Sequence, residues 1–288
     1  MQKVPKILVC NDDGITAQGI KALCQVAREF GISRQALYRN KTGKTRVFYH
    51  RQDDAAIVAR IRDMLTVRPT YGYKRITVML NRQDWPRINR KRVYRLMRMH
   101  GLVLPTGVYG PKRPHTGKVM VTTPNTRWCS DAFEIKCFNR EKVYVAFALD
   151  CCDRGALAFV AHTRPLLATD IQDLMVAAVA GRFDSLRTPR SIQWLTDRGG
   201  IFRAKDTTDL GKALGLLPCA TRAYSPESNG MAEAFVKTFK RDYVYNHDCD
   251  TPETVLALLP AWFDDYGQAP HSALAYQSPS EYLANHIS

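Results

Sequence analysis

The sequence predicts an α/β domain with a mixed β-sheet, preceded by a helical DNA-binding region of the helix-turn-helix type. Charge is the first observation behind this prediction. Residues 1–120 carry 25 Lys and Arg against 7 Asp and Glu, whereas residues 121–288 carry 17 against 20. A basic first part joined to a nearly neutral second part is typical of a polyanion-binding module placed before a domain with another task. The second observation is that short strand-like runs and amphipathic stretches follow one another after residue 126.

The basic part of the chain contains a pattern of two short helices joined by a turn. Residues 26–39 predict this pattern, and Ser33 caps the second helix. Arg34 and Arg39 lie on that second helix, where a helix-turn-helix protein contacts DNA. The pattern is short and common, so it supports the prediction only together with the charge. Residues 53–82 predict two further helices, which are separated at Pro69.

A strongly basic helix is predicted over residues 88–102. Asn89 supplies its N-cap and Gly101 its stop signal, while apolar residues recur at helical spacing along one face. So many cations with few acids to pair them favour contact with phosphates over a plain solvated surface. The predicted DNA contacts on this helix are Arg90, Lys91, Arg92 and Arg95.

Residues 104–126 are the best candidate linker, because they hold four prolines and three glycines. This linker divides the chain into an N-terminal segment (1–23), a helical DNA-binding region (24–103) and a catalytic core with a C-terminal helical extension (127–288). Within the core, the pattern predicts three strands, a helix, a strand, a helix, a strand and a final helix. The segments are 127–135, 142–150, 155–162, 168–183, 191–197, 208–216, 216–222 and the stretch that follows Gly230.

Three carboxylates fall where α/β folds build their sites, at strands and at the start of a helix. Asp131 lies in the first strand, Asp197 ends the fourth, and Glu233 lies in the first turns of the final helix. Converging carboxylates repel one another unless cations lie between them, and Mg²⁺ prefers carboxylate and phosphate oxygens. Two such ions, about 3.5–4 Å apart, activate the attacking oxygen and stabilise the leaving one in phosphoryl transfer.

The helix that carries Glu233 also carries Lys237 and Lys240 on the same side, beside an apolar stripe. If the stripe packs on the sheet, Glu233 points to the sheet's edge and the two lysines are available to DNA phosphates. The alternative is a plain Glu–Lys pair on a solvated surface. The spacing of all three acids, taken together, favours the site.

Three motifs, WCSDAFE, LTDRGG and SPESNGMAEAFVKTFKRD, resemble those of the DDE transposases of bacterial insertion sequences, in particular the second-frame products of small copy-and-paste elements. In that family thirty-five residues separate the second acid from the Glu, and a Lys or Arg follows seven residues later. Asp197, Glu233 and Lys240 have the same spacing. HSALAYQSPSEYL resembles the family's C-terminal signature, and INRKRVYRLMRMHGL resembles part of its helical DNA-binding region. The likeness covers roughly residues 25–288.

The resemblance implies an RNase H-like integrase core in which Asp131, Asp197 and Glu233 hold the catalytic metal. Mg²⁺ is then the natural ion, and Mn²⁺ can substitute. The implied activity is that of a polynucleotidyl transferase that cleaves DNA strands at the ends of the element and transfers them. Its implied partners are end and target DNA, further copies of the chain on paired ends, and the upstream-frame protein of the same element.

Arg198 is a departure from the family, which usually has Asn or Gln at this position. With Lys237 and Lys240 it would position phosphates, but a cation next to a metal ligand also tends to weaken metal binding. The segment 266–271 lacks the usual Asn and Arg, and Ala275 stands where Gly is common. These changes leave open an alternative, a degenerate transposase that acts only as a DNA-binding protein or repressor.

The first residues, KILVCNDDGITAQGIKAL, resemble the N-terminus of the SurE-type nucleotidases. In that family an Asn-Asp-Asp-Gly turn carries metal-binding aspartates, which match Asp12 and Asp13. The match stops near residue 23, so nucleotidase activity is the weakest of the three functions. The segment predicts a junction, in which an insertion element joined its reading frame to the first codons of such a gene.

The cysteines and the apolar runs predict the compartment. None of the eight cysteines forms a C-x-x-C pair, so we expect buried thiols in a reducing environment. No secretory signal is visible, and no apolar run approaches the roughly 18–20 residues that span a bilayer. We therefore expect a cytoplasmic, nucleoid-associated protein without a membrane partner.

Overall fold

The computed structural model describes residues 51–83, 86–105, 121–197, 199–220 and 230–287, together with Gln25 and Glu29. From Gln52 onward the chain forms one compact unit. The expected junction segment (1–23), most of the pattern expected over 26–39 and the centre of the linker lie outside the described residues. Three of the predicted DNA contacts also lie outside them, namely Arg34, Arg39 and Arg198.

Three helices form the helical region, α3 (Asp54–Val67), α4 (Tyr73–Asn81) and α5 (Arg90–Met99). The predicted separation of the first two at a proline turn is confirmed. The helices pack around an apolar core of their own, because each carries apolar residues at helical spacing. The most buried members of this core are Ile57, Ile61, Ile76, Leu80, Val93, Leu96 and Met97.

The ends of α5 match the expected signals. The Asn89 side chain accepts a hydrogen bond from the Lys91 amide at 2.8 Å, which satisfies one of the open N–H groups of the first turn. Gly101 ends the helix with φ +67°, in the left-handed region that residues with a Cβ seldom adopt. The expected helix boundaries are therefore confirmed within one to two residues.

The core contains a five-stranded mixed sheet in the order β3-β2-β1-β4-β5. β1 pairs antiparallel with β2 and β2 with β3, whereas β1 pairs parallel with β4 and β4 with β5. The mixed sheet was predicted, and each strand lies within a residue or two of its expected segment. The strands are β1 (Arg127–Lys136), β2 (Lys142–Asp150), β3 (Ala156–His162), β4 (Ile192–Thr196) and β5 (Leu216–Ala220).

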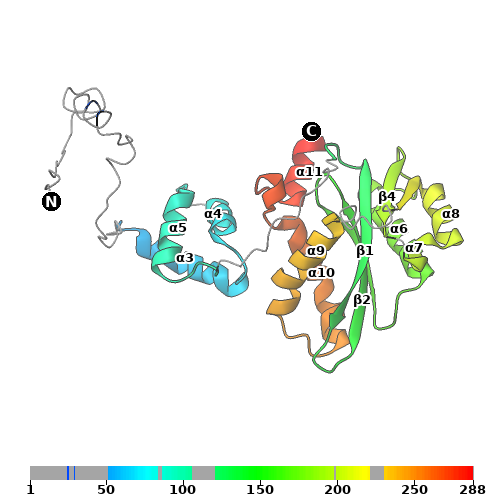
Figure 1. The fold of residues 1–288 in the computed structure, drawn as a ribbon, viewed down its shortest axis with the longest axis horizontal. Coiled ribbons are helices and arrows are strands. Elements are labelled where there is room, and N and C mark those ends of the chain that lie inside the picture. Colours follow the sequence, from blue (N-terminus) through cyan, green and yellow to red (C-terminus); the bar gives the residue numbers. More distant parts are fainter. Residues whose placement is uncertain are drawn as a thin grey trace. The chain divides into compact units, whose positions relative to one another are not determined.

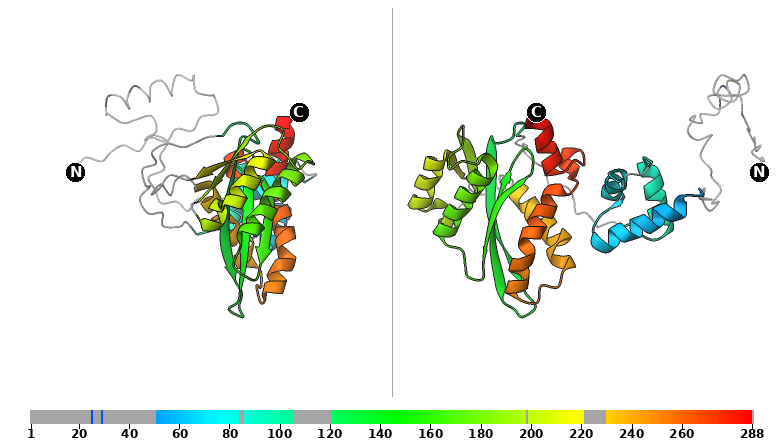
Figure 2. Two further views of the ribbon diagram at one scale, coloured as in Figure 1. Left: turned by 90° about the vertical axis from the view of Figure 1, so that its right-hand side faces the viewer. Right: turned by 180° about the vertical axis from the view of Figure 1, so that it is seen from behind.

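Helices cover both faces of this sheet (Figure 1). α6 (Ala168–Phe183), α7 (Gly200–Arg203) and α8 (Lys205–Leu214) cover one face. α9 (Gly230–Asp242) and α10 (Pro252–Gln268) cover the other, as the two further views also show (Figure 2). Two 3₁₀ turns, Val244–Asn246 and Ser272–Leu274, and helix α11 (Pro279–Ile287) complete the described part of the chain.

The sequence missed α7 and placed the start of α8 three residues too late. α7 is a single turn, and only Phe202 anchors it in the core, at 5% exposure. One turn with one buried residue shows no periodicity, so the sequence pattern does not reveal this helix.

The pleat of the strands divides the core into two clusters. Cys129, Phe133 and Ile135 of β1 face α9 and α10, whereas Trp128 faces α6 on the other side. β2 divides its residues in the same way. Successive side chains of a strand point to opposite faces, so both faces of a central strand read as apolar when helices cover both.

The end of the expected linker is part of the core. The Thr126 carbonyl accepts a hydrogen bond from Gln193 N at 3.1 Å, and Val121 packs against the cluster under α9 and α10. The segment 121–126 therefore contacts the core through Val121 and Thr126, and the expected linker overlaps the core at this end.

Candidate active site

Asp131 lies in β1, and Asp197 directly follows the end of β4, the parallel neighbour of β1. The last pair of this ladder is Cys129 opposite Leu195. Asp131 is two residues beyond Cys129 and Asp197 two residues beyond Leu195, so both acids follow the same end of the ladder, and the charge of Asp197 influences Asp131. Cys129 and Leu195 both pack into the cluster under α9, and the period of two puts the acids on that same face.

Glu233 approaches this face from α9. Phe235 and Phe239 of α9 pack on the sheet, with ring centroids 4.4 Å from Phe147 and 5.8 Å from Phe133. Phe147 is the antiparallel partner of Asp131, so the first turn of α9 lies over the part of β1 that carries the acid. The predicted apolar stripe is thus buried, and Glu233, half exposed, lies at its edge.

Asp131 is shifted toward its neutral form. Burial first, and then the charges of Asp197 and Glu233, raise the pKa of Asp131 to about 6. A hydrogen bond from the Ala132 amide, at 2.8 Å, opposes this rise without cancelling it. Ionising Asp131 is therefore unfavourable in the folded chain, first because the side chain is buried and then because two other acids influence it.

Without metal, the protein should lose stability as the pH rises from about 4 to about 6, because Asp131 must then ionise in a buried position and near two other acids. Its folded-state pKa of about 6 lies above the model value of 3.8, so its stabilising contribution is complete below the lower value and is lost above the higher one. Asp131→Asn should make the metal-free protein more stable at neutral pH by about 1–2 kcal/mol, less than the full shift because the side chain is partly exposed.

Urea unfolding in the presence of EDTA measures this difference, with Asp173→Asn, an exposed acid on α6, as the matched control. The control should unfold like the wild type. Equal stability of Asp131→Asn and wild type at neutral pH would show that the charge at the site is already neutralised.

The Asp197 carboxylate is held in place by the turn that follows it. Its Oδ1 accepts a hydrogen bond from the Gly199 amide at 2.8 Å. A Cβ built on Gly199 would lie 3.0 Å from that oxygen and 3.4 Å from the Phe202 ring, although the backbone conformation itself allows any residue. Gly199 is thus a residue of the site that the sequence analysis did not predict, because its contact with the Asp197 carboxylate appears only in the fold.

Gly199→Ala should lower strand-cleavage activity about tenfold or more with little change in stability. The added methyl group would displace the Asp197 carboxylate by tenths of an ångström, and catalysis requires its ligands at well-defined positions. A cleavage assay and a thermal melt on the same preparation measure the two effects. Gly72→Ala is the matched control, since a Cβ there meets nothing within 4 Å. An unchanged cleavage rate would mean that this turn does not position Asp197.

The two lysines of α9 differ in their surroundings. Lys237 is 80% exposed and lies 4.0 Å from Glu233, which is the loose pair that the alternative interpretation described. Lys240 is half-buried, and its ammonium lies 5.5 Å from the centre of the Phe133 ring. Burial lowers the pKa of Lys240. Lys237 is therefore the better placed of the two to contact phosphates beside the acids.

Two of the four predicted phosphate contacts on α5 already have acidic partners. Asp54 of α3 accepts hydrogen bonds from Arg92 Nε at 2.9 Å and from Arg95 Nη2 at 2.7 Å, and Arg92 also pairs with Asp53. The expectation of few nearby acids thus needs correction, because α3 brings these two from about 40 residues away. Arg90 and Lys91 are exposed.

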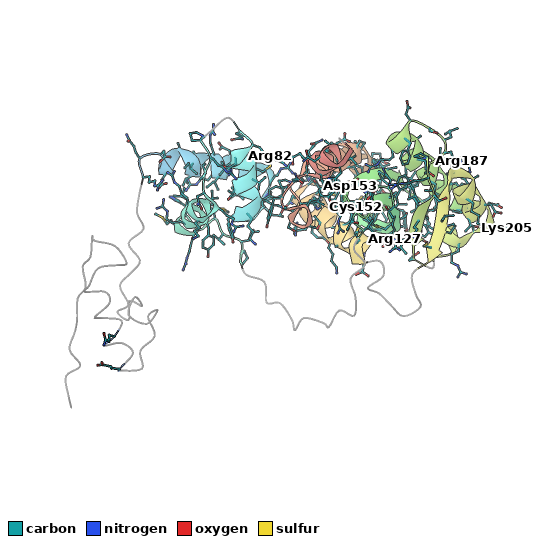
Figure 3. All side chains as sticks on the ribbon, turned by 90° about the horizontal axis from the view of Figure 1, so that it is seen from above. Arg82, Arg127, Cys152, Asp153, Arg187 and Lys205 are labelled. Atoms are coloured by element: carbon teal, nitrogen blue, oxygen red, sulfur yellow. The ribbon has the colours of Figure 1, made fainter. Side chains whose placement is uncertain are left out.

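Asp150 and Asp153 form a buried polar network rather than a second acidic site. Asp150 accepts hydrogen bonds from the Asn125 amide at 2.6 Å, the Trp128 indole at 3.1 Å and a backbone amide of the following turn. Arg182 pairs with Asp153, which is labelled in Figure 3. The network ties the chain before β1 to the end of β2, and every carboxylate has partners.

The donors at Asp131, Asp197 and Glu233 suit a hard divalent cation, because all three are carboxylates. A nearby cation would also lower the raised pKa of Asp131, which burial and then the charges of Asp197 and Glu233 produce. Within the residues that the structure describes, however, no group of three or more His, Cys, Asp or Glu side chains is arranged to hold a metal ion. The three carboxylates are thus suitable ligands for a cation, but their side chains are not arranged around a common metal position.

No helix in the described part of the chain has the length and the apolar character to cross a bilayer.

Family models match most of the described part of the chain. An HTH-like domain matches residues 51–107, and two integrase core domain models match residues 121–226 and 214–279. The HTH-like match covers α3 to α5, and the two core matches together cover the sheet and helices α6 to α10.

A relative of known identity is the transposase InsD for insertion element IS2A/D/F/H/I/K of Escherichia coli. The two chains are 45% identical over 238 residues, which are 80% of this chain and 79% of the relative. Among solved structures, a simian T-cell lymphotropic virus intasome in complex with PP2A regulatory subunit B56 gamma matches with a TM-score of 0.47, at 14% identity over 79% of this chain and 74% of the other. The catalytic domain of the Mos1 mariner transposase matches with 0.42, at 17% identity over 57% and 76%.

The family assignment depends on the sequence identity and not on these two structural likenesses. The resemblance to insertion-sequence transposases is confirmed, whereas the resemblance of residues 1–23 to SurE-type nucleotidases stays a prediction. The chain matches an HTH-like domain and an integrase core, and it is 45% identical to InsD over four fifths of its length. This protein therefore belongs to the family of insertion-element transposases with an integrase core.

Proposed function

We propose that Asp131, Asp197 and Glu233 form the catalytic site with which this transposase cleaves DNA and transfers the cut strand. DNA cleavage and strand transfer are the activity of its family. The observation that supports these residues is the parallel pairing of β1 with β4, because Asp131 and Asp197 both follow the same end of that ladder, on the side of the sheet covered by the helix that carries Glu233.

A divalent cation is the cofactor of such an integrase core, and we propose Mg²⁺, with Mn²⁺ able to substitute. Bound at the site, it would supply activation of the attacking oxygen and stabilisation of the leaving one. The chain's own residues would orient the donors: β1 fixes Asp131, the Gly199 amide fixes the Asp197 carboxylate, and the first turn of α9 presents Glu233. No covalent protein intermediate is needed.

DNA binding by the protein divides between two surfaces in this proposal. Arg90 and Lys91, exposed on α5, would bind the ends of the element, with Arg92, Arg95, Arg34 and Arg39 as further predicted contacts. Lys237, and at the edge of the site Lys240 and Arg198, would hold phosphates beside the acids. Affinity carried by phosphate contacts falls steeply as salt rises.

Assembly of several copies on paired ends, an upstream-frame partner protein and a nucleoid-associated location are part of the same proposal. They follow from the family resemblance and the chemistry of the reaction, since two ends of one element must be cut and joined together.

Labelled DNA that flanks this protein's own gene tests the proposed function. The wild type should cut specific strands in Mg²⁺ or Mn²⁺ and leave them intact in EDTA. A matched reaction contains the upstream-frame protein of the same element as well. DNA binding without any cut in either reaction would contradict the proposal and favour the alternative, a protein that binds DNA or represses without cutting.

A further inference from the structure

Three arginines of the HTH-like helices reach acids on the C-terminal helices of the core. Arg68, at the end of α3, donates to Asp265 of α10 through both of its terminal nitrogens, one of them at 2.5 Å. Arg75 of α4 lies 2.8 Å from Asp242, the last residue of α9. Arg82, labelled in Figure 3, pairs with Glu281 of α11 and donates to the Gln268 carbonyl at 3.0 Å. We call these three pairs the arginine clasp.

Two of the three pairs of the clasp are joined to further hydrogen bonds, whereas Arg82 and Glu281 pair at the surface. The Asp242 side chain is only 6% exposed, and it also accepts a hydrogen bond from Thr70 Oγ1 at 2.6 Å. Asp265 accepts a further one from the Tyr243 hydroxyl at 2.8 Å. A buried carboxylate with several donors, such as Asp242, is costly to separate from them, because its charge would be left without a partner.

Tyr71 gives the clasp its geometry. The guanidinium carbons of Arg68 and Arg75 lie 5.2 Å and 4.8 Å from the centre of its ring, and the ring itself is 1% exposed. Tyr71 belongs to the apolar core of the HTH-like helices, so the two guanidiniums are fixed to that core before they meet the acids. Such preorganisation reduces the entropy that is lost when the pairs form.

The position of Asp242 connects the clasp to the site. α9 is one continuous helix of 13 residues, with Glu233 in its first turn and Asp242 at its last residue. Because the helix is a regular element, the position of its last residue fixes the position of its first turn. The HTH-like helices are therefore anchored on the same element that presents the third acid.

We propose that the arginine clasp is a positioning interface, which fixes the HTH-like helices to α9 so that DNA bound by those helices is cut at a set distance from where it is bound. This inference depends on the proposed function of the three acids. Arg68, Arg75, Asp242 and Asp265 are positioning residues in it, and none of them touches the reacting atoms.

Arginine footprinting of the full chain tests the clasp directly, without any need for activity. Phenylglyoxal should modify Arg68 and Arg75 at least about tenfold more slowly than Arg62 and Arg98, since tenfold protection corresponds to only about 1.4 kcal/mol of pairing. Arg62 and Arg98 are exposed arginines of the same three helices and so are matched controls. Equal rates for all four in the wild type would overturn the proposal.

The variant Asp242→Asn with Asp265→Asn tests the positioning role. It should raise the reactivity of Arg68 and Arg75 to that of the controls, and it should still cut DNA, but at scattered positions. Cuts confined to the wild-type positions while the two arginines are released would overturn the positioning role. If the variant fails to fold, the wild-type footprint still decides whether the clasp forms. A footprint with full protection but no cutting by the wild type would contradict the proposed function and leave the clasp supported.

Discussion

Asp197→Asn should lower metal-dependent strand cleavage at least about 10³-fold while the protein keeps its fold. The amide keeps the shape and the hydrogen bond from the Gly199 amide but removes the charge that a divalent cation needs. Losing several kcal/mol of charge stabilisation has this effect, because each 1.36 kcal/mol is worth a factor of ten in rate. Single-turnover cleavage of labelled end DNA in Mg²⁺ measures the change.

The control for this variant is Asp209→Asn, which removes one negative charge from an exposed position on α8 of the same domain. It should cleave at the wild-type rate. Both variants should bind end DNA and melt close to the wild type, which separates loss of chemistry from loss of fold. An Asp197→Asn protein that cleaves within tenfold of the wild type would remove Asp197 from the proposed site.

Phe239→Ala should destabilise the protein by about 3–5 kcal/mol, the range for truncating a buried aromatic residue. Phe239 is fully buried at the centre of the cluster that joins α9 and α10 to the sheet. Five rings lie within 4.7–6.1 Å of its own, measured between centroids: those of Phe133, Phe235, Tyr243, Trp262 and Phe263. None of these rings can fill the space of a missing ring without leaving its own position.

Urea unfolding followed by tryptophan fluorescence measures this loss, and Phe239→Leu should lose clearly less because it keeps most of the apolar volume. Phe138→Ala is the exposed control, since that ring is 71% exposed, and it should stay within about 0.5 kcal/mol of the wild type. A loss below about 1 kcal/mol for Phe239→Ala would mean that α9 is not held to the sheet by this cluster. Cleavage would also be expected to fall, because the same helix presents Glu233.

The sequence by itself determined the local elements, since their signals are local. The proline turn between α3 and α4, the Asn89 cap and Gly101 stop of α5, and the apolar runs of the strands all depend on residues close in the chain. The three candidate acids also came from sequence, although through the spacing of a family resemblance. Periodicity alone placed them on two strands and a helix and could not tell how far apart these elements lie.

Tertiary structure decided everything that depends on contacts between distant residues. Only the parallel register of β1 and β4 sets Asp131 beside Asp197, and only the fold brings Asp54 to Arg92 and Asp242 to Arg75. The reason is that a charged residue shows its type in the sequence but not its partner, and pairing depends on geometry built by the rest of the chain.

Helix α10 shows the same division within one element. Pro260 lies inside it, where proline removes a backbone hydrogen bond and costs about 3 kcal/mol, so local rules alone predict a break. The helix continues because Val255 and Leu259 before the proline, and Trp262 and Phe263 after it, are all buried in the core under α9. The sequence determined which residues are apolar, and packing against the sheet decided that one helix would carry them.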